Sequence, residues 1–278
     1  MPVTFPAHQG LILPAKLRWP GAIDATALCI AAGSPDLAYS LSPWLNRQSH
    51  TAIGVLVLAV PVAVVAAWIT RRWAASGIFA ALPDLGPLRL RSYRVLAVRR
   101  PPWWQTLTSA LLGAGSHVVV DGFTHAGRWG ANWAGLNGVI GSLPGRGELT
   151  AARVLQYVGH LGGSLAFVLV LVVVASSGRL ATWYGAEAVA LARSVTATGP
   201  QRASFALLAI GPPVVAAIVA DDLGRSPLFL AVTVSLPALL LAGTVVGSWL
   251  DGPGVVGGDG AGGTALDPVA DPTPIRPI

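Results

Sequence analysis

The chain has 278 residues, of which 53% are hydrophobic and only 11% are charged, and its mean hydropathy is +0.64. Soluble proteins carry about 25% charged residues, so this composition excludes an ordinary soluble domain and predicts an integral membrane protein. The single cysteine, Cys29, excludes an internal disulfide framework and a Cys-rich zinc module. The net charge of +6 comes mostly from arginine.

The N-terminal region lacks the basic start and long apolar run of a signal peptide, so we expect its first residues in the mature protein. The next apolar stretch, Gly21 to Ser34, holds about a dozen residues, fewer than the roughly 20 that cross a bilayer. Such a length is typical of a buried, re-entrant or interfacial helix, and we place it at the membrane interface. Because Pro35 disfavours helix at Ser34, Asp36 is expected in a turn or on the first turn of a new helix, where free N–H groups stabilise a carboxylate.

Two predicted membrane spans are separated by an arginine-rich segment. Residues Thr51 to Thr70 form an unbroken apolar run of the length of one span, and Thr106 to Thr124 form a second. The loop between them, residues 71–105, carries seven arginines and a single acid, Asp84. The positive-inside rule therefore predicts that this loop is cytoplasmic in a cell-membrane protein and that the second span returns outward.

Three further spans complete the predicted fold, an all-α, polytopic transmembrane helix bundle of about five spans. They cover Leu155 to Ser176, Ser204 to Ala220 and Leu228 to Leu250. We divide the chain into a metal-site membrane domain at residues 1–177, scaffold helices at 178–250, and a tail at 251–278. The scaffold spans carry no histidine or charge, and the tail, rich in Gly, Pro and Asp, is expected to be disordered and cytoplasmic.

The residues His117, Asp121 and His125 follow one another at intervals of four in the second predicted span. On a helix of about 3.6 residues per turn, this spacing places all three side chains on one face. An aspartate at the centre of a membrane helix costs roughly 2.5 to 3.5 kcal/mol, so it normally has a partner or a function. The stripe therefore predicts either a functional site or hydrogen bonds to a neighbouring helix.

The predicted orientation brings other ionisable residues toward the non-cytoplasmic end of this stripe. They are His8, Asp36, His50 and His160. Imidazole and carboxylate bind zinc or manganese without thiolates, and an open coordination position lowers the pKa of a bound water toward about 7. The alternative for each residue taken singly is structural: His50 at the membrane interface, His8 in a terminal loop, and Asp36 as a helix cap.

Three short motifs resemble those of bacterial membrane-bound metal-dependent hydrolase-like proteins: Ser-Pro-Asp at 34–36, Ser-His-Thr at 49–51 and His-x-x-x-Asp at 117–121. The opening Pro-x-Thr-Phe-Pro-Ala-His and the ending Asp-x-x-Thr-His more specifically resemble a related, uncharacterised family of bacterial multi-pass membrane proteins, a domain of unknown function, over roughly residues 1–177. Those families more commonly have Thr-His at 49–50, and an acid they often carry two residues after the first aspartate is missing, which puts a second metal in doubt. The resemblance implies metal-site positions at His8, Asp36, His50, His117 and Asp121.

The functional prediction is a membrane protein that hydrolyses an ester or phosphoester of a lipid or amphiphile at a metal site on its non-cytoplasmic face. The candidate catalytic residues are His125 and His160, with His125 as a further ligand or a proton shuttle. A phosphate could be held by one of three cationic side chains, Arg18, Arg47 or Arg128.

The expected partner is the membrane lipid bilayer, and no nucleic acid is expected. Two rival predictions come from other functional classes. One is a transporter or proton relay, in which Asp121 and the histidines carry protons. The other is a structural membrane protein, in which the histidines bind no metal.

Overall fold

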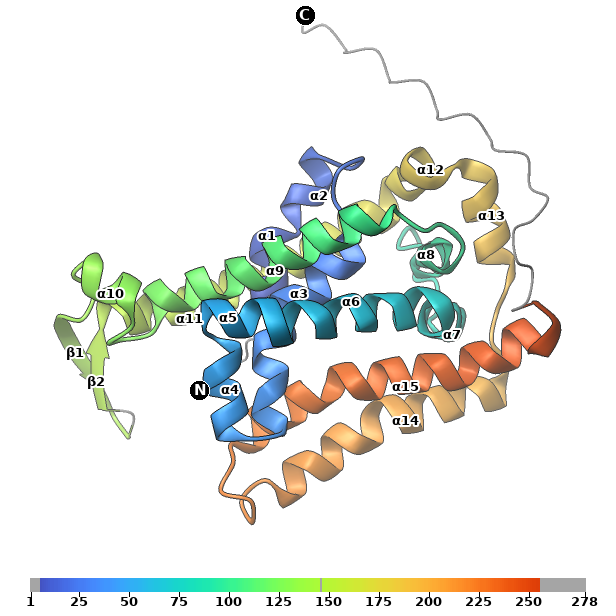
Figure 1. The fold of residues 1–278 in the computed structure, drawn as a ribbon. Coiled ribbons are helices and arrows are strands. Elements are labelled where there is room, and N and C mark those ends of the chain that lie inside the picture. The colour runs from blue at the N-terminus through green and yellow to red at the C-terminus, as the bar shows by residue number, and fades with distance from the viewer. Residues whose placement is uncertain (1–5, 146, 256–278) are drawn as a thin grey trace, which may run out of the picture.

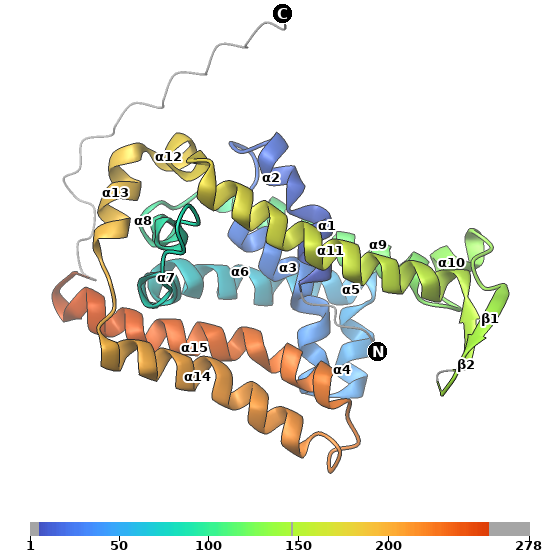
Figure 2. The same cartoon turned by 180° about the vertical axis from the view of Figure 1, so that it is seen from behind.

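The computed structural model describes residues 6–145 and 147–255, in which most of the chain is helical (Figures 1 and 2). The N-terminal half contains α1 Ala7–Ile12, α2 Pro14–Arg18, α3 Ala25–Leu37, η1 Ala38–Ser40, α4 Pro43–Ser49, α5 Ala52–Gly54, η2 Val55–Ala59, α6 Val60–Ile69, η3 Thr70–Ala74, α7 Ala75–Ala81, η4 Leu90–Arg94, α8 Val95–Val98 and α9 Trp103–Thr124. The C-terminal half contains α10 Trp129–Trp133, β1 Val139–Leu143, β2 Gly147–Thr150, α11 Ala151–Ser176, α12 Arg179–Tyr184, α13 Ala186–Ser194, α14 Gly199–Val219 and α15 Pro227–Val255. The all-α prediction is confirmed, and the antiparallel hairpin of β1 and β2 is an addition that was not predicted.

Four helical segments of the described residues are long and apolar enough to cross a membrane. They are Ala52–Ala81, Ala151–Ser176, Gly199–Val219 and Pro227–Leu250. Helix α9, the expected second span, has 22 residues but is not among these four. Its hydropathy is lowered by the small and polar residues that it buries, which include Ser109, Gly113, His117 and Asp121. The chain is a membrane protein, and α9 buries one face in the bundle while the opposite face, with Leu112 and Val119, is exposed.

The first span is longer than predicted. Elements α5, η2, α6, η3 and α7 form one continuous helix over Ala52–Ala81, so Arg71 and Arg72 lie inside this helix rather than at the start of a loop. Arg71 is tolerated there because it is buried against the carboxylate of Asp24, with which it forms an ion pair. The connecting segment to α9 begins after Ala81 and contains η4 and α8.

Helix α3 is the short apolar segment that was expected at the membrane interface, and the structure surrounds it with α1, α6 and α9. Ala27, Ala31 and Ala32 are fully buried. A Cβ on Gly113 of α9 would overlap the carbonyl oxygen of Leu28, so the two backbones are in direct contact. Small residues at a helix crossing allow this close approach in membrane proteins, and they make α3 the core of the bundle.

The position of Asp36 differs from its prediction. Pro35 and Asp36 belong to the last turn of α3 rather than to a turn or the start of a new helix. Proline cannot donate to the carbonyl four residues earlier, and here the Ser34 hydroxyl donates to that carbonyl, Ala31 O, at 3.0 Å. The helix therefore continues through Pro35, and the Asp36 side chain is buried against neighbouring helices instead of facing free N–H groups.

The remaining long helices pack around this core. Helix α1 crosses α11 where Gly10 faces Gly163, and a Cβ on Gly163 would overlap Ala7 O. Helices α14 and α15 form a pair that packs against η3 and α7, with Gly243 in contact with the backbone of Ala74. Of the predicted tail, residues 251–255 extend α15, and residues 256–278 lie outside the described residues.

Candidate metal centre

A buried cluster of three histidines and two aspartates, here called the His/Asp cluster, forms where four segments of the chain meet. Helix α1 contributes one residue, the last turn of α3 a second, the C-cap of α4 a third, and α9 the last two. The members are His8, Asp36, His50, His117 and Asp121, and all five are buried. These are the five positions proposed from the sequence as metal ligands, and the fold brings them together.

His117 is fully buried, and its two ring nitrogens have different environments. Nδ1 lies 2.8 Å from Ala32 O. A carbonyl oxygen can only accept, so Nδ1 carries the proton and donates it. The Nε2 lone pair then points into the cluster, 3.7 Å from Asp36 Oδ1 and 3.6 Å from Asp121 Oδ2. This arrangement is the usual one for a metal-binding histidine held by a backbone carbonyl.

His50 repeats the same arrangement from another element. Its Nδ1 lies 2.7 Å from Asn46 O, so Nδ1 donates to that carbonyl. Its Nε2 faces the cluster, 3.3 Å from His117 Nε2, 3.3 Å from Asp36 Oδ1 and 3.6 Å from Asp121 Oδ2. Ser49 ties this corner to α3 by donating its hydroxyl to Pro35 O at 2.7 Å. The backbone of α3 therefore sets the position of His50.

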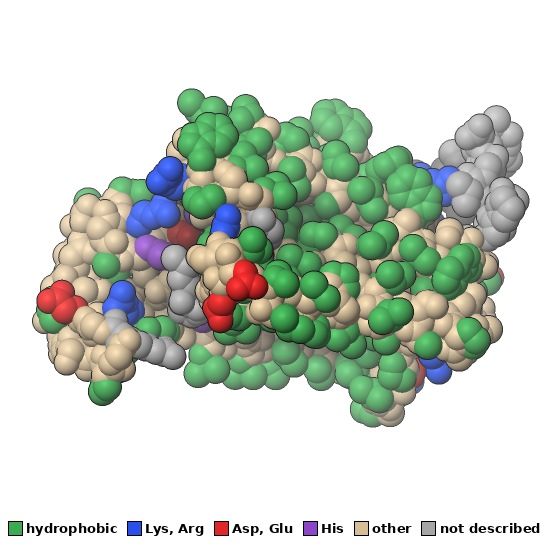
Figure 3. Space-filling model, turned by 90° about the horizontal axis from the view of Figure 1, so that it is seen from below, with side chains coloured by type: hydrophobic (Ala, Val, Ile, Leu, Met, Phe, Trp, Pro, Cys, Tyr) green, Lys and Arg blue, Asp and Glu red, His purple; other side chains and the backbone are tan. Residues whose placement is uncertain are grey.

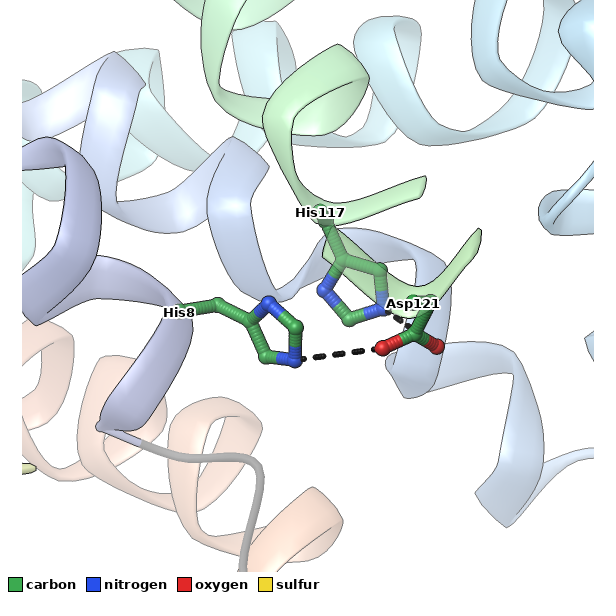
Figure 4. Close-up of side chains that lie close together, drawn as sticks. All are labelled: His8, His117 and Asp121. Carbon is green, nitrogen blue, oxygen red and sulfur yellow. Dashed lines mark ion pairs between the residues drawn. The ribbon is translucent and has the colours of Figure 1, made fainter. Parts of the chain in front are cut away.

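His8 completes the cluster from α1 (Figure 4). Its ring stacks on that of His117 with centroids 4.0 Å apart, and its Nε2 lies 3.5 Å from Asp121 Oδ1. Burial lowers the pKa of His8 well below its usual value, and the neighbouring His117 adds to that effect. His8 is therefore a neutral imidazole, the form that binds metal ions.

The cluster has more acceptor atoms than donor hydrogens. Asp36 Oδ2 and Asp121 Oδ1 are buried and accept no hydrogen bond from any residue that the structure describes, and His8 Nδ1 is also unpartnered within it. Burial acts to raise the pKa of Asp36, but His117 and His50 beside it hold that pKa below its usual range. Burial acts to lower the pKa of His50, but the hydrogen bond and charge of Asp36 raise it overall, so without a metal ion a protonated His50 can balance this carboxylate. A bound cation would take the place of that proton.

The separations between these atoms suit a divalent metal ion. Two ligands about 2.0 to 2.2 Å from one tetrahedral zinc ion are about 3.3 to 3.6 Å apart, and the separations among Asp36, His50, His117 and Asp121 given above run from 3.3 to 3.7 Å. Two groups of three residues have their ligand atoms within 4.8 Å of one another: Asp36 with His50 and His117, and His8 with His117 and Asp121. The cluster could hold a metal ion.

The two histidines proposed as catalytic lie at the edge of the cluster. The predicted helical stripe is correct for His117 and Asp121 but not for His125, because α9 ends at Thr124 and His125 is its C-cap. From that position His125 Nδ1 still lies 3.5 Å from Asp121 Oδ1. His160 on α11 packs edge-on to His8, with ring centroids 6.1 Å apart.

The cationic residues suggested for phosphate binding are not equivalent. Arg47 lies on α4, one turn before His50, and the backbone N–H of Arg128 donates to His125 O at 3.2 Å, so both flank the cluster. Arg18 lies at the end of α2, next to Trp19, and that segment leads to the opposite end of α3.

A second buried polar cluster was missed in the sequence. Asp24 at the start of α3 forms it with Arg71 and with the hydroxyl of Thr106, which donates to Asp24 at 2.8 Å. No role was predicted for Asp24 from the sequence. The signal that could have found it was the helix-cap pattern, an Asp directly before a helix. In the structure, the Asp24 side chain accepts hydrogen bonds from the N–H groups of Thr26 and Ala27.

Comparison with known proteins gives a family but no activity. A family profile described as a domain of unknown function (DUF4184) matches residues 1–249. The match extends beyond residue 177, where the resemblance was expected to end, and it takes in α14 and most of α15. No curated protein and no solved structure matches the chain.

Proposed function

The chain belongs to the DUF4184 family of unknown function, and we propose that it is a metal-dependent membrane hydrolase. In this proposal the His/Asp cluster binds zinc or manganese, and the substrate is an ester or phosphoester of a lipid or amphiphile. The observation that carries the proposal is the inward direction of two histidine Nε2 lone pairs toward two buried carboxylates, with no donor hydrogen from the described residues on Asp36 Oδ2 or Asp121 Oδ1. A buried set of ligands with unpartnered carboxylate oxygens is stabilised by a bound cation.

The chemistry assigns distinct roles to the residues of this chain. A divalent ion, when bound, acts as a Lewis acid toward the substrate oxygen and the attacking water. The carboxylates and the three buried imidazoles hold the ion and exclude bulk water from it. His125 is 29% exposed and touches the cluster through Asp121, which places it to take a proton from the water and return it to the leaving group.

A lipid or amphiphile is favoured as substrate by the surroundings of the cluster. Figure 3 shows hydrophobic side chains over the middle and right of one face, and at its left exposed histidine atoms beside basic side chains. Arg47 and Arg128 are both exposed near the cluster, and guanidinium groups pair well with phosphate. An apolar tail in the bilayer and a charged headgroup at the cluster would be held together by this surface.

The metal is tested first, because the other parts of the proposal depend on it. The full-length protein is purified in mild detergent, and its bound metal is measured beside His117→Ala and Asp121→Ala. Wild-type protein should retain zinc or manganese, and both variants should lose most of it. Equal, negligible metal in all three proteins would contradict the proposal. Release of acid from p-nitrophenyl esters, phosphodiesters and phospholipid vesicles then tests the hydrolysis.

The orientation is proposed separately: of the predicted loop 71–105, the segment between the first span and α9, residues 82–102, faces the cytoplasm of a cell-membrane protein, and the His/Asp cluster faces the other side. Support comes from the arginines before α9, Arg99 and Arg100, at the end of α9 opposite Asp121. A reporter that is active only outside the cytoplasm should be inactive when fused after Arg91 and active when fused after Gly135. The reverse result would place the cluster on the cytoplasmic side.

The same protein preparation distinguishes the proton-relay alternative. If the purified chain binds no metal but acidifies or alkalinises the interior of proteoliposomes, and Asp121→Asn stops this movement, the cluster carries protons instead. A chain that does neither has a structural cluster. The hydrolase proposal requires metal and turnover together.

A further inference from the structure

Asp121 directs its two carboxylate oxygens toward different sets of histidines. Oδ2 lies 3.6 Å from Nε2 of His50 and 3.6 Å from Nε2 of His117. Oδ1 lies 3.5 Å from His8 Nε2 and 3.5 Å from His125 Nδ1. Oδ1 is also buried and accepts no hydrogen bond from the described residues. One carboxylate therefore has a nitrogen-lined position on each side.

His117 can serve only one of these two positions. It belongs to both donor groups, the one with Asp36 and His50 and the one with His8 and Asp121. Its Nδ1 is committed to Ala32 O, so Nε2 is its single free lone pair. That lone pair lies 3.3 Å from His50 Nε2, on the side of the first group. An ion on the other side needs a different second nitrogen, and His125 Nδ1 has the separation from Asp121 Oδ1 that a shared ion requires.

We propose that the chain binds two divalent metal ions bridged by the carboxylate of Asp121. The first ion is held by Asp36, His50, His117 and Asp121 Oδ2, and the second by His8 Nε2, His125 Nδ1 and Asp121 Oδ1. This proposal rests on the proposed function, which requires only the first ion; it moves His8 to the second ion and makes His125 a ligand in place of a proton shuttle. The acid missing after Asp36 does not prevent it, because a carboxylate from α9 serves both ions. Paired metal ions activate the attacking and leaving oxygens of phosphoester hydrolysis.

The surroundings of His125 suit a metal ligand beside a coordination position that is open to exchange. Ligation through Nδ1 requires the proton on Nε2, and the Gln156 side chain is 2.7 Å from that atom. The amide accepts the proton through its oxygen after a half-turn about its last bond. A small cavity lined by His8, Gln156 and His160, among others, adjoins this position. The second ion is thus the one nearer to the exposed side of the cluster.

The test is the ratio of metal to chain in the full-length, detergent-purified protein, loaded with zinc and freed of excess zinc. Wild-type protein should hold two ions per chain, and His8→Ala and His125→Ala should each hold one. His160→Ala is the matched control, a histidine deletion across the same cavity, and it should keep both ions. Loading with manganese adds a spectroscopic measurement: the exchange-coupled electron spin resonance signal of a bridged pair should be lost in His125→Ala.

Each outcome decides the proposal. One ion per chain in the wild type, unchanged in His125→Ala, overturns the second position and leaves the proposed function intact. No ion in the wild type overturns both. Loss of one ion in His160→Ala but not in His125→Ala overturns the assignment of His125. Elution from size exclusion checks folding, and if His125→Ala aggregates, His125→Gln keeps a polar side chain of similar length and should also hold one ion.

Discussion

Two buried polar clusters lie at opposite ends of α3 and α9, and they differ in how their charges and hydrogen bonds are balanced. At the N-terminal ends, Asp24 accepts from two backbone N–H groups and from Thr106, and pairs with Arg71. At the C-terminal ends, the carboxylates of the His/Asp cluster face imidazole lone pairs and retain unpartnered oxygens among the described residues. Along α9, the Thr106 and Asp121 ends are about 22 Å apart.

This difference predicts a structural role for the Asp24 cluster and supports the proposed metal-binding role of the His/Asp cluster. A carboxylate that has a guanidinium and three hydrogen-bond donors needs no further partner, so the Asp24 cluster is expected to stabilise the fold as it stands. A set of acceptors without donors is unfavourable in a protein interior unless an ion completes it. Burial alone would have placed both clusters in the same class; the count of donors against acceptors distinguishes them.

The largest expected loss of stability follows a substitution in the Asp24 cluster. Asp24→Ala leaves Arg71 buried without its carboxylate, and it should lower the free energy of unfolding in detergent by about 3 to 5 kcal/mol. Asp121→Ala in metal-free protein should have a much smaller effect, because Asp121 has no guanidinium partner and its Oδ1 accepts no hydrogen bond from the described residues. Equal losses of stability in chemical or thermal unfolding would show that the two clusters do not differ in this way.

The second effect concerns metal removal. Saturation with an ion at about 100 to 1,000 times its dissociation constant stabilises the folded state by roughly 2.7 to 4.1 kcal/mol, and a chelator should remove that stabilisation. Asp121→Ala, which removes the carboxylate shared by both proposed ions, should show no response to the chelator, whereas Thr106→Ala, a change in the Asp24 cluster, should respond as the wild type does. A chelator shift that persists in Asp121→Ala would place the metal elsewhere.

The third effect tests how α1 delivers His8 to the His/Asp cluster. Gly163→Leu inserts a side chain where α11 contacts Ala7 O, and overpacking of this kind costs about 1 to 3 kcal/mol. Metal content should fall as well, because α1 is displaced. Gly162→Leu, at the neighbouring position, is the control. A Cβ on Gly162 would have no atom within 4 Å, so both the stability and the metal content should be unchanged. If Gly163→Leu retains full metal content, the crossing does not position His8.

The smallest expected loss of stability comes from a partly exposed polar contact in the segment before α9. Burial acts to raise the pKa of Asp84, but hydrogen bonds from the Arg91 N–H and the Arg193 and Arg91 guanidinium groups, each at 3.0 Å, lower it overall. A lowered pKa stabilises the fold above about pH 4, the pKa of an unfolded aspartate, and this contribution is lost as the pH falls through the folded pKa.

Solvent screening limits the Asp84 contribution to about 1 kcal/mol or less. The comparison is therefore between unfolding curves of the wild type and Asp84→Asn from pH 7 to pH 3. The difference between them should be constant near neutrality and disappear toward low pH. A stability difference that grows on acidification would mean that the surroundings of Asp84 disfavour its ionised form.

Run lengths and composition were sufficient to predict the helical membrane fold. Four of the five predicted spans correspond to the four apolar helical segments. A run of about 20 apolar residues has the length that a helix needs to cross a bilayer. The five ligand candidates also came from the sequence: the spacing of His117 and Asp121 placed them on one helix face, and the full set followed from the resemblance of short motifs to those of metal-dependent hydrolase-like proteins. The sequence did not predict the hydrogen-bond and charge partners of each of these side chains.

Tertiary packing decided those partners. Pro35 lies inside a helix whose freed carbonyl accepts from the Ser34 hydroxyl. The extension of the first span through Arg71 depends on its ion pair with Asp24, which is 47 residues away. The use of α3 as a core helix depended on Gly113 of α9. The sequence by itself determined which groups are costly to bury; only the folded chain decided which of them found donors and which, in the His/Asp cluster, are left facing one another. The reason is that hydrogen bonding and charge balance are set by neighbours in space, and those neighbours are distant along the chain.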